Sequence, residues 1–358
     1  MSDSLQAHAI NVFWSHLRAL KVELDKPGVQ ELMVNRPDDI WIEKAGEPMV
    51  RLDMKILPEN ILAAVQALRT SNGKAASPIM DARSHGIRLA IAMSPVAVNG
   101  HCMCIRKHSA LRFTMDDYLK QGAFNVLTFD ERAERDKDSG RPDADYVGRG
   151  GQGVADMLRW MMQSHQSILI AGATGSGKTS LMDMLLGEIP QTDRVITIED
   201  TAELKVEVPN SVSFEVSEKD EVRVVHLVKL SLRFRPDRVI LGEIRGAEAY
   251  DLLDVLNTGH SGGMCTLHAN SAIDALLRLE SLVRKSPDAA NLPLGAMRSS
   301  IAAAFRFVIF ASKKGGKRGP EEIMELTGMD DDGNYITRMV FSKTKSVQQV
   351  VSVDEPAG

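Results

Sequence analysis

The sequence has little of several features that would mark a particular class of protein. Its 358 residues include only three cysteines, Cys102, Cys104 and Cys265, which is too few for a disulfide framework. No C-x-x-C pair occurs, so a structural zinc site is not expected. The net charge of −5 and a pI of about 6.0 show no basic excess. We therefore expect a protein of a reducing compartment, without direct sequence-specific binding to nucleic acid.

Long hydrophobic runs are missing as well. The most apolar stretch, residues 89–105, is interrupted by Pro95 and Gly100 and is too short and broken to span a bilayer. Residues 1–5 have neither a basic start nor an apolar core, so no signal peptide is expected. We predict a cytoplasmic location, and peripheral contact with a membrane complex remains compatible with the sequence.

What the sequence does contain is a complete phosphate-binding P-loop pattern at residues 172–179. An apolar run that suits a buried parallel strand precedes it, and apolar residues at helical spacing follow. Strand, loop and helix in this order direct backbone N–H groups and a helix dipole at one small volume, which suits a triphosphate. The expected nucleotide-binding residues here are Gly172, Ala173, Thr174, Gly175, Ser176, Gly177, Lys178, Thr179 and Ser180.

The identity of the residues at the end of this loop favours a triphosphate over a dinucleotide. Lys178 would contact the β- and γ-phosphates, and the Thr179 hydroxyl would bind Mg²⁺. The glycine spacing does not match the Rossmann pattern, in which a Lys-Thr pair would have no role. A chance glycine-rich turn is the remaining alternative, and the flanking strand and helix argue against it.

Length and composition predict two domains. An N-terminal α+β domain is assigned to residues 1–128, and a charged flexible linker to 129–151, although one solvated helix would also fit the linker. Within the first domain we expect helices at 5–25 and 58–70, a hairpin of strands 31–35 and 40–43, and strands at 86–93 and 102–107. Residues 344–358 are predicted to be a tail.

Residues 152–343 alternate between apolar strand candidates and helices, which predicts an α/β domain with a parallel sheet covered on both faces. The expected strands are 167–171, 194–199, 238–242 and 262–267. The expected helices are 154–164, 178–187, 221–234, 246–257, 271–284 and 296–305. Three further strands are expected at 306–312, 321–328 and 334–342, the last two antiparallel through a turn at 331–334.

Carboxylates end two of the expected parallel strands. Glu243 follows 238–242, and Glu199 ends 194–199, with Asp200 and Glu203 close behind. Ligands bind at the carboxyl ends of parallel strands, so these acids would divide water activation and Mg²⁺ binding between them. The sequence leaves that division open. Ordinary surface carboxylates, or acids at a helix N-terminus, are the alternative interpretation.

Histidines and arginines are less specific signals. His260 and His268 flank the strand expected at 262–267, and we expect both at its rim, where His268 could contact the γ-phosphate through a ring N–H. A lone histidine is more often structural. Arginines from another domain or subunit can serve phosphoryl transfer, although most arginines only solvate a surface. The candidates are Arg88, Arg106, Arg233, Arg235, Arg238 and Arg245.

Four sequence blocks together resemble the secretion traffic ATPase family, the RecA-like NTPases of type II and type IV secretion, conjugation and type IV pili. They are the P-loop, an acidic box at 197–204, the second acidic motif at 235–246 and a histidine box at 258–271. Two details favour the type IV secretion and conjugation branch. Residue 246 is Gly, where type II secretion and twitching members more often have Asp, and the tetracysteine element of many type II secretion members is missing.

The resemblance implies a C-terminal RecA-like P-loop NTPase domain and a smaller N-terminal α+β domain. It also implies a homohexamer at the cytoplasmic face of the inner membrane, in contact with membrane-embedded secretion-system ATPases and scaffold proteins. ATP and Mg²⁺ would be the cofactors. The implied site residues are Lys178, Glu199, Glu243 and His268 for catalysis, Thr179, Glu199 and Glu243 for the metal, and Arg88 and Arg106 for the nucleotide.

The predicted function is ATP hydrolysis that powers pilus biogenesis or substrate transfer in a type IV secretion or conjugation system. A pilus motor of the tight-adherence or twitching type is the nearest alternative, and a DNA translocase is a more distant one. Which subunit's N-terminal domain caps each site is left open by the unusual length of the charged stretch at 129–151.

Overall fold

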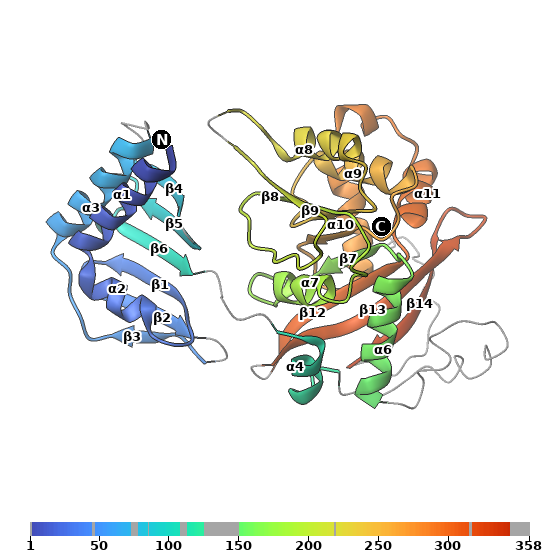
Figure 1. Ribbon diagram of the computed structural model, residues 1–358, viewed down its shortest axis with the longest axis horizontal. Helices are drawn as coiled ribbons and strands as arrows, with labels where there is room; N and C mark the ends of the chain where they lie inside the picture. Colours follow the sequence, from blue (N-terminus) through green and yellow to red (C-terminus); the bar gives the residue numbers. More distant parts are fainter. Residues whose placement is uncertain are drawn as a thin grey trace, which may run out of the picture. The chain divides into compact units, whose positions relative to one another are not determined.

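The computed structural model describes residues 2–44, 47–72, 78–84, 86–107, 113–124, 150–217, 220–314 and 317–343. The chain divides into two compact units, Met1–Leu111 and Arg112–Gly358, and each is described by itself (Figure 1). Of the predicted linker, residues 129–149 lie outside the described residues, as does the whole predicted tail.

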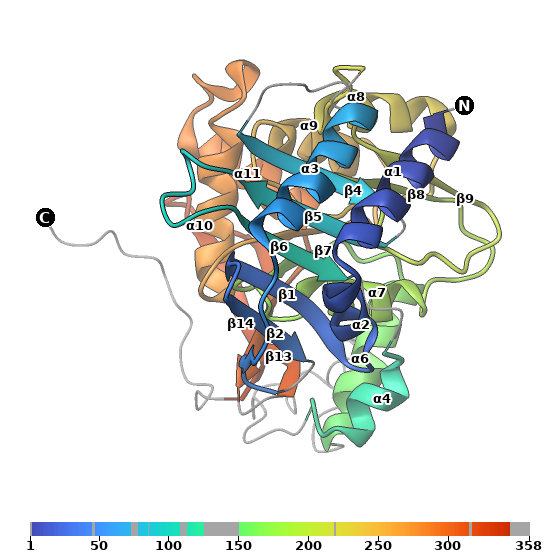
Figure 2. The same cartoon turned by 90° about the vertical axis from the view of Figure 1, so that its left-hand side faces the viewer.

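The first unit is a six-stranded antiparallel sheet in the order β3-β2-β1-β6-β5-β4, with helices on one face (Figure 2). Its elements are α1 (Ser2–His16), α2 (Arg18–Asp25), β1 (Val29–Arg36), β2 (Asp39–Lys44), β3 (Val50–Leu52), α3 (Pro58–Asn72), β4 (Ile79–Ser84), β5 (Ile87–Ala92) and β6 (Cys102–Lys107). The predicted hairpin, the helix that begins at Pro58 and the pair of strands at β5 and β6 are confirmed.

Two details of this unit differ from the sequence prediction. The single helix expected at 5–25 is two helices, because Leu17 leaves the helical region with φ −121° and ψ 38°. Leu17 is fully buried there, and the break lets α1 and α2 both pack on one core. Strands β3 and β4 were not predicted, since β3 is only 3 residues long and too short for a visible period.

The boundary between the units lies earlier than the predicted one at residue 128. Helix α4 (Met115–Lys120) and Phe124 belong to the second unit, where Met115, Tyr118 and Phe124 are buried in one cluster with α6 and α7. The apolar side chains of this segment fix its place, whereas the sequence assignment followed the change to charged residues that begins at 129.

The second unit is built on an eight-stranded sheet in the order β14-β13-β12-β7-β11-β10-β8-β9. Neighbouring strands from β12 to β9 are parallel, and β13 and β14 are antiparallel. The strands are β7 (Ile168–Ala171), β8 (Val195–Glu199), β9 (Ser211–Glu215), β10 (Arg238–Leu241), β11 (Met264–Leu267), β12 (Phe307–Lys314), β13 (Lys317–Met329) and β14 (Tyr335–Ser342). Apart from the edge strand β9, all of them were predicted.

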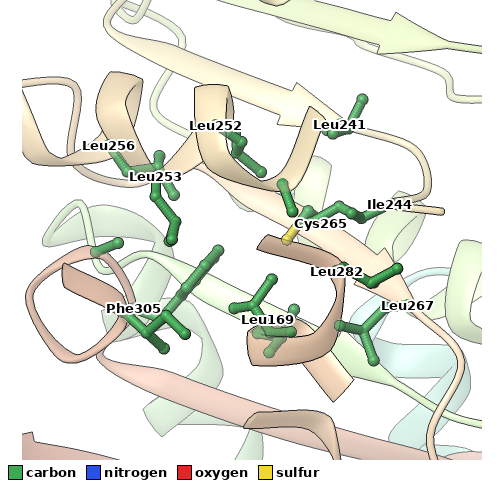
Figure 3. Close-up of a cluster of buried hydrophobic side chains, with 14 of the residues drawn as sticks. Leu169, Leu241, Ile244, Leu252, Leu253, Leu256, Cys265, Leu267, Leu282 and Phe305 are labelled. Carbon is green, nitrogen blue, oxygen red and sulfur yellow. The ribbon is translucent and has the colours of Figure 1, made fainter. Parts of the chain in front are cut away.

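Helices lie on both faces of this sheet, as predicted, and bury a separate apolar cluster on each face. They are α6 (Gly150–Gln163), α7 (Lys178–Leu186), α8 (Val224–Ser231), α9 (Glu248–Asn257), α10 (Ala272–Val283) and α11 (Leu294–Ala304). Figure 3 shows one cluster, in which Leu252, Leu253 and Leu256 of α9 lie with Leu169 and Cys265 of the strands. Strand β7 is buried at all four positions, which is typical of a central parallel strand.

Candidate active site

The P-loop connects the buried strand β7 to helix α7 at the carboxyl edge of the sheet. Gly175 and Gly177 have φ of 73° and 94°, a region in which side chains are strained, and Gly177 is the N-cap of α7. A Cβ on Gly172 would lie 2.4 Å from the Ala311 carbonyl oxygen, so only glycine fits there. The glycines that the motif requires are therefore required by this backbone as well.

The loop fits a bound phosphate group. The Ser176 hydroxyl is buried inside the loop and has no hydrogen-bond partner among the described residues. A buried polar atom without a partner is costly, and a phosphate oxygen would satisfy this one. The loop also ends at the N-terminus of α7, where the helix dipole favours negative charge.

Lys178 directs its ammonium group into this loop. The side chain is only 8% exposed, and Nζ donates hydrogen bonds to the carbonyl oxygens of Gly172 at 2.9 Å and Ala173 at 3.1 Å. These neutral acceptors can be exchanged for phosphate oxygens, which form stronger charge-assisted bonds. The ammonium group of Lys178 is thus held inside the loop.

Thr179 and Ser180 occupy the first turn of α7, with Thr179 exposed. No cluster of three or more His, Cys, Asp or Glu side chains within the described part of the chain is arranged to hold a metal ion. The Thr179 hydroxyl at the start of α7 is an oxygen of the kind that can bind Mg²⁺ together with phosphate oxygens.

His268 connects Lys178 to Glu243. It follows β11, the strand next to β7, and its Nδ1 lies 3.3 Å from Lys178 Nζ. Its Nε2 lies 2.8 Å from Oε1 of Glu243, which follows β10. A neutral ring that accepts from the lysine at Nδ1 carries its proton on Nε2, on the side of Glu243. The structure therefore brings these three predicted residues together.

Glu199 lies one strand further along, on β8, and faces the side of the sheet that carries α7, because Val195 on the same face packs in the cluster of α7. It is 5% exposed, and its carboxylate accepts hydrogen bonds from the backbone N–H groups of Glu203 at 3.0 Å and Leu204 at 3.1 Å. Burial raises the pKa of Glu199 to about 7, against the lowering effect of these two amides. A carboxyl group with this pKa can accept or release a proton near neutral pH.

Asp183 is a neighbour of this site that the sequence did not single out. It lies on α7 one turn after Thr179, and its Oδ1 accepts the N–H of Lys205 at 2.9 Å. Glu199 and Asp183 together hold three consecutive amides, 203–205. This contact brings the loop after β8, and with it Glu199, beside the first turns of α7. The sequence signal was only an acid four residues after Thr179, on the same helix face.

The remaining candidates lie elsewhere. Arg238 is fully buried at the start of β10, the end of the sheet away from the P-loop. His260 precedes β11 and His268 follows it, so these two histidines, both expected at the rim of this strand, lie at its opposite ends. Nδ1 of His260 is buried and has no hydrogen-bond partner among the described residues. Arg233 and Arg235 are exposed around the turn after α8.

Arg88 and Arg106 belong to the first unit, where they face each other across β5 and β6. Buried residues alternate with them along both strands, so both arginines lie on the face opposite the unit's core. Arg106 lies 3.7 Å from Glu31 on the next strand. Two like charges lie directly opposite each other here, and the Glu31 carboxylate offsets part of their repulsion.

The fold and the loop define a P-loop nucleotide-binding protein, and comparisons with known proteins agree. Residues 135–313 match the family model of the type II/IV secretion system protein. The chain is 31% identical to the type IV secretion system protein PtlH of Bordetella pertussis over 87% of this chain and 93% of that protein. It is 30% identical to the conjugal transfer protein TrbB of Rhizobium radiobacter over 86% of this chain and 87% of that protein.

The chain therefore belongs to the type II/IV secretion system protein family, in the type IV secretion and conjugation branch, as its motifs predicted. The X-ray structure of the Yersinia pseudotuberculosis ATPase DotB superposes with a TM-score of 0.56 at 15% identity, covering 89% of this chain and 79% of that one. This likeness confirms the two-domain P-loop fold. Each helix that the structure describes is too short or too polar to cross a membrane.

Proposed function

We propose that this chain is a Mg²⁺-dependent ATPase that powers pilus biogenesis or substrate transfer in a type IV secretion or conjugation system. The observation that carries the proposal is the contact series from Lys178 through His268 to Glu243, next to a P-loop with a buried, unpartnered Ser176 hydroxyl. The series links the phosphate-binding group to a carboxylate at a neighbouring strand end. The family relationship supports the same interpretation.

Each residue has a defined task in this proposal. Lys178 exchanges the carbonyl oxygens of Gly172 and Ala173 for β- and γ-phosphate oxygens. The Thr179 hydroxyl, with Glu199 or Glu243 through water, holds Mg²⁺, which supplies charge stabilisation to the transferring phosphoryl group. Glu243 orients the attacking water, and His268, between Glu243 and Lys178, responds to the γ-phosphate.

The wider assembly is part of the proposal. In it the protein is a homohexamer, peripheral at the cytoplasmic face of the inner membrane, and works with membrane-embedded ATPases and scaffold proteins of the secretion system. Arg88 and Arg106 contribute positive charge to the nucleotide, which their cross-strand pairing favours. Light scattering with and without a non-hydrolysable ATP analogue tests the ring, and a monomer under both conditions would contradict it.

The first test of the function is phosphate release from ATP and Mg²⁺ by the wild type and by Lys178→Ala. We expect the variant to lose at least about a hundredfold in rate, because the ammonium group stabilises the charge of the transition state. Lys21→Ala, which removes an exposed ammonium paired with Asp25 in the first unit, is the control and should retain wild-type activity. Equal rates for the wild type and Lys178→Ala would refute the site. Stimulation by DNA would favour the translocase alternative instead.

A further inference from the structure

The Glu243 carboxylate accepts a hydrogen bond at one oxygen and is approached by a second side chain at the other. His268 Nε2 lies 2.8 Å from Oε1, and Nη2 of Arg245 donates a hydrogen bond to Oε2 at 2.5 Å. The first contact leads to the P-loop, and the second leads away from it. Oε1 is buried and has no hydrogen-bond partner among the described residues, so the bond from Arg245 to Oε2 fixes the plane of the carboxylate and determines how Glu243 is presented to the nucleotide site.

Arg245 is itself anchored at several points. Its Nη1 donates to Oδ2 of Asp200 at 2.6 Å, and Asp200 directly follows β8. Its backbone N–H donates to Glu248 Oε1 at 2.6 Å, and its carbonyl oxygen accepts from Lys285 Nζ at 3.2 Å. The guanidinium therefore bridges the ends of two neighbouring strands, β10 and β8, through one carboxylate on each.

The exposure of Arg245 argues against a role in holding the fold together. Its side chain is 53% exposed, and ion pairs of exposed side chains contribute little to stability. The guanidinium also forms one wall of a cavity of about 610 Å³, together with Asp200 and Glu243. A side chain that makes several hydrogen bonds and yet contributes little to folding is a candidate for a role in chemistry.

We propose that Arg245 is a positioning residue that orients the Glu243 carboxylate for water activation, with Asp200 as its anchor. This inference rests on the proposed ATPase function. Arg245 acts through Glu243 and contacts the nucleotide at no point. The planar guanidinium serves two carboxylates at once, whereas the ammonium group of a lysine is a single point charge that cannot hold the same geometry. Arginine is thus required at this position for its shape as well as its charge.

The test compares full-length wild type with Arg245→Ala, Arg245→Lys, Asp200→Asn and the double variant Arg245→Ala/Asp200→Asn. Phosphate release is measured over a range of ATP concentrations, and binding of a fluorescent ATP analogue is measured separately. We expect Arg245→Ala to lower kcat by about tenfold to a hundredfold, the effect of a small misplacement of a reacting group. KM and nucleotide affinity should stay within about twofold, because the phosphates are bound by the P-loop.

The other variants separate positioning from a structural role. Arg245→Lys should recover part of kcat, and Asp200→Asn should lower kcat less than Arg245→Ala does. In the double variant the Asp200 change should add nothing, since its effect passes through Arg245. The proposal is overturned if Arg245→Ala leaves kcat unchanged or lowers only the nucleotide affinity. It is also overturned if the losses in kcat of the two single variants multiply in the double variant.

Failure of the positioning role and failure of the ATPase function give different results. A wild type that hydrolyses ATP no faster than Lys178→Ala removes the function and everything that rests on it. A wild type whose activity depends on Lys178 but not on Arg245 removes only the positioning role. If Arg245→Ala does not fold, Arg245→Lys and Asp200→Asn give the same kcat-against-KM comparison.

Discussion

Arginine has opposite roles at the two ends of the parallel strands in the eight-stranded sheet. We call the end where these strands begin the amino edge and the end where they finish the carboxyl edge. At the amino edge, Arg238 is 0% exposed and donates to Asp193 Oδ2 at 2.6 Å, to the Met162 carbonyl at 2.5 Å and to the Gly262 carbonyl at 3.3 Å. At the carboxyl edge, Arg245 is 53% exposed and pairs with Glu243 and Asp200. Arg238 is the first residue of β10, and Arg245 follows the end of the same strand.

The difference separates a buried charge that stabilises the fold from exposed charges that are available for chemistry. Burial lowers the pKa of Arg238, although the hydrogen bond to Asp193 opposes this effect, so the protein itself must satisfy the charge. The hydrogen bond to Glu243 raises the pKa of Arg245 against a smaller effect of burial. The amino edge is thus a closed structural cluster, and the carboxyl edge keeps charges that can change partners.

Arg238→Met should lower the free energy of unfolding more than any other variant in this comparison, because it disrupts the cluster at the amino edge. It leaves the Asp193 carboxylate, 8% exposed, without its cation, which costs about 3–5 kcal/mol of unfolding free energy. Urea unfolding is the measurement, and Arg245→Met is the matched control, with an expected loss of about 1 kcal/mol or less.

A second variant shows whether the cost comes from the orphaned carboxylate. Arg238→Met/Asp193→Leu removes both charges and should recover much of the stability lost in Arg238→Met, because an apolar pair replaces the buried ion pair. Equal losses for Arg238→Met and Arg245→Met would contradict the distinction between the two edges.

Glu199 sharpens the comparison, because it is a buried acid at the same edge as the partly exposed Arg245, Glu243 and Asp200. Its folded pKa of about 7 lies above the ordinary value of 4.5 for this group, so the carboxyl group binds its proton more tightly in the folded protein. Stability from this group is complete below about pH 4.5 and is lost as the pH rises through 7. At pH 8 the loss amounts to about 3 kcal/mol.

The measurement is urea unfolding of wild type and Glu199→Gln without nucleotide at several pH values. Glutamine does not titrate, so the stability of wild type relative to the variant should fall between about pH 4.5 and pH 7 and then level off. A difference between the two proteins that does not change with pH would show that Glu199 remains ionised in the fold.

The sequence predicted those parts of the site that follow from a motif and a parallel topology. Lys178, Glu243 and His268 lie at the ends of adjacent strands or in a fixed loop, so recognising the strands was enough to bring them together. The roles of Asp183 and Arg245 were not visible, because they depend on which amides and carboxylates meet after folding. In the sequence Asp183 is an ordinary charged residue, and Arg245 is only one of several candidate arginines.

The sequence predicted three other features incorrectly or not at all, each for a reason of its own. His260 and His268 were both expected at the rim of one strand, and β11 between them puts the two residues at opposite ends of that strand. Residues 113–124 were given to the first domain because nothing in their composition shows that Tyr118 and Phe124 stack in the core of the second. Strand β9 pairs with β8 at an edge with a half-exposed pattern, which is weak in sequence.

The smallest effect that we expect concerns the loop held by Glu199 and Asp183 at the carboxyl edge. Asp183→Ala removes the acceptor of the Lys205 N–H, so exchange of that amide with solvent should accelerate about fivefold, equivalent to about 1 kcal/mol of local stability. Hydrogen exchange read by NMR or mass spectrometry measures it. The Arg194 amide, which donates to Asp237 at the amino edge, is the internal control and should not change. Unchanged exchange at Lys205 would show that Glu199 alone holds the loop. Acceleration at both amides would mean that the two edges open together. The amino edge would then not be an independent structural cluster.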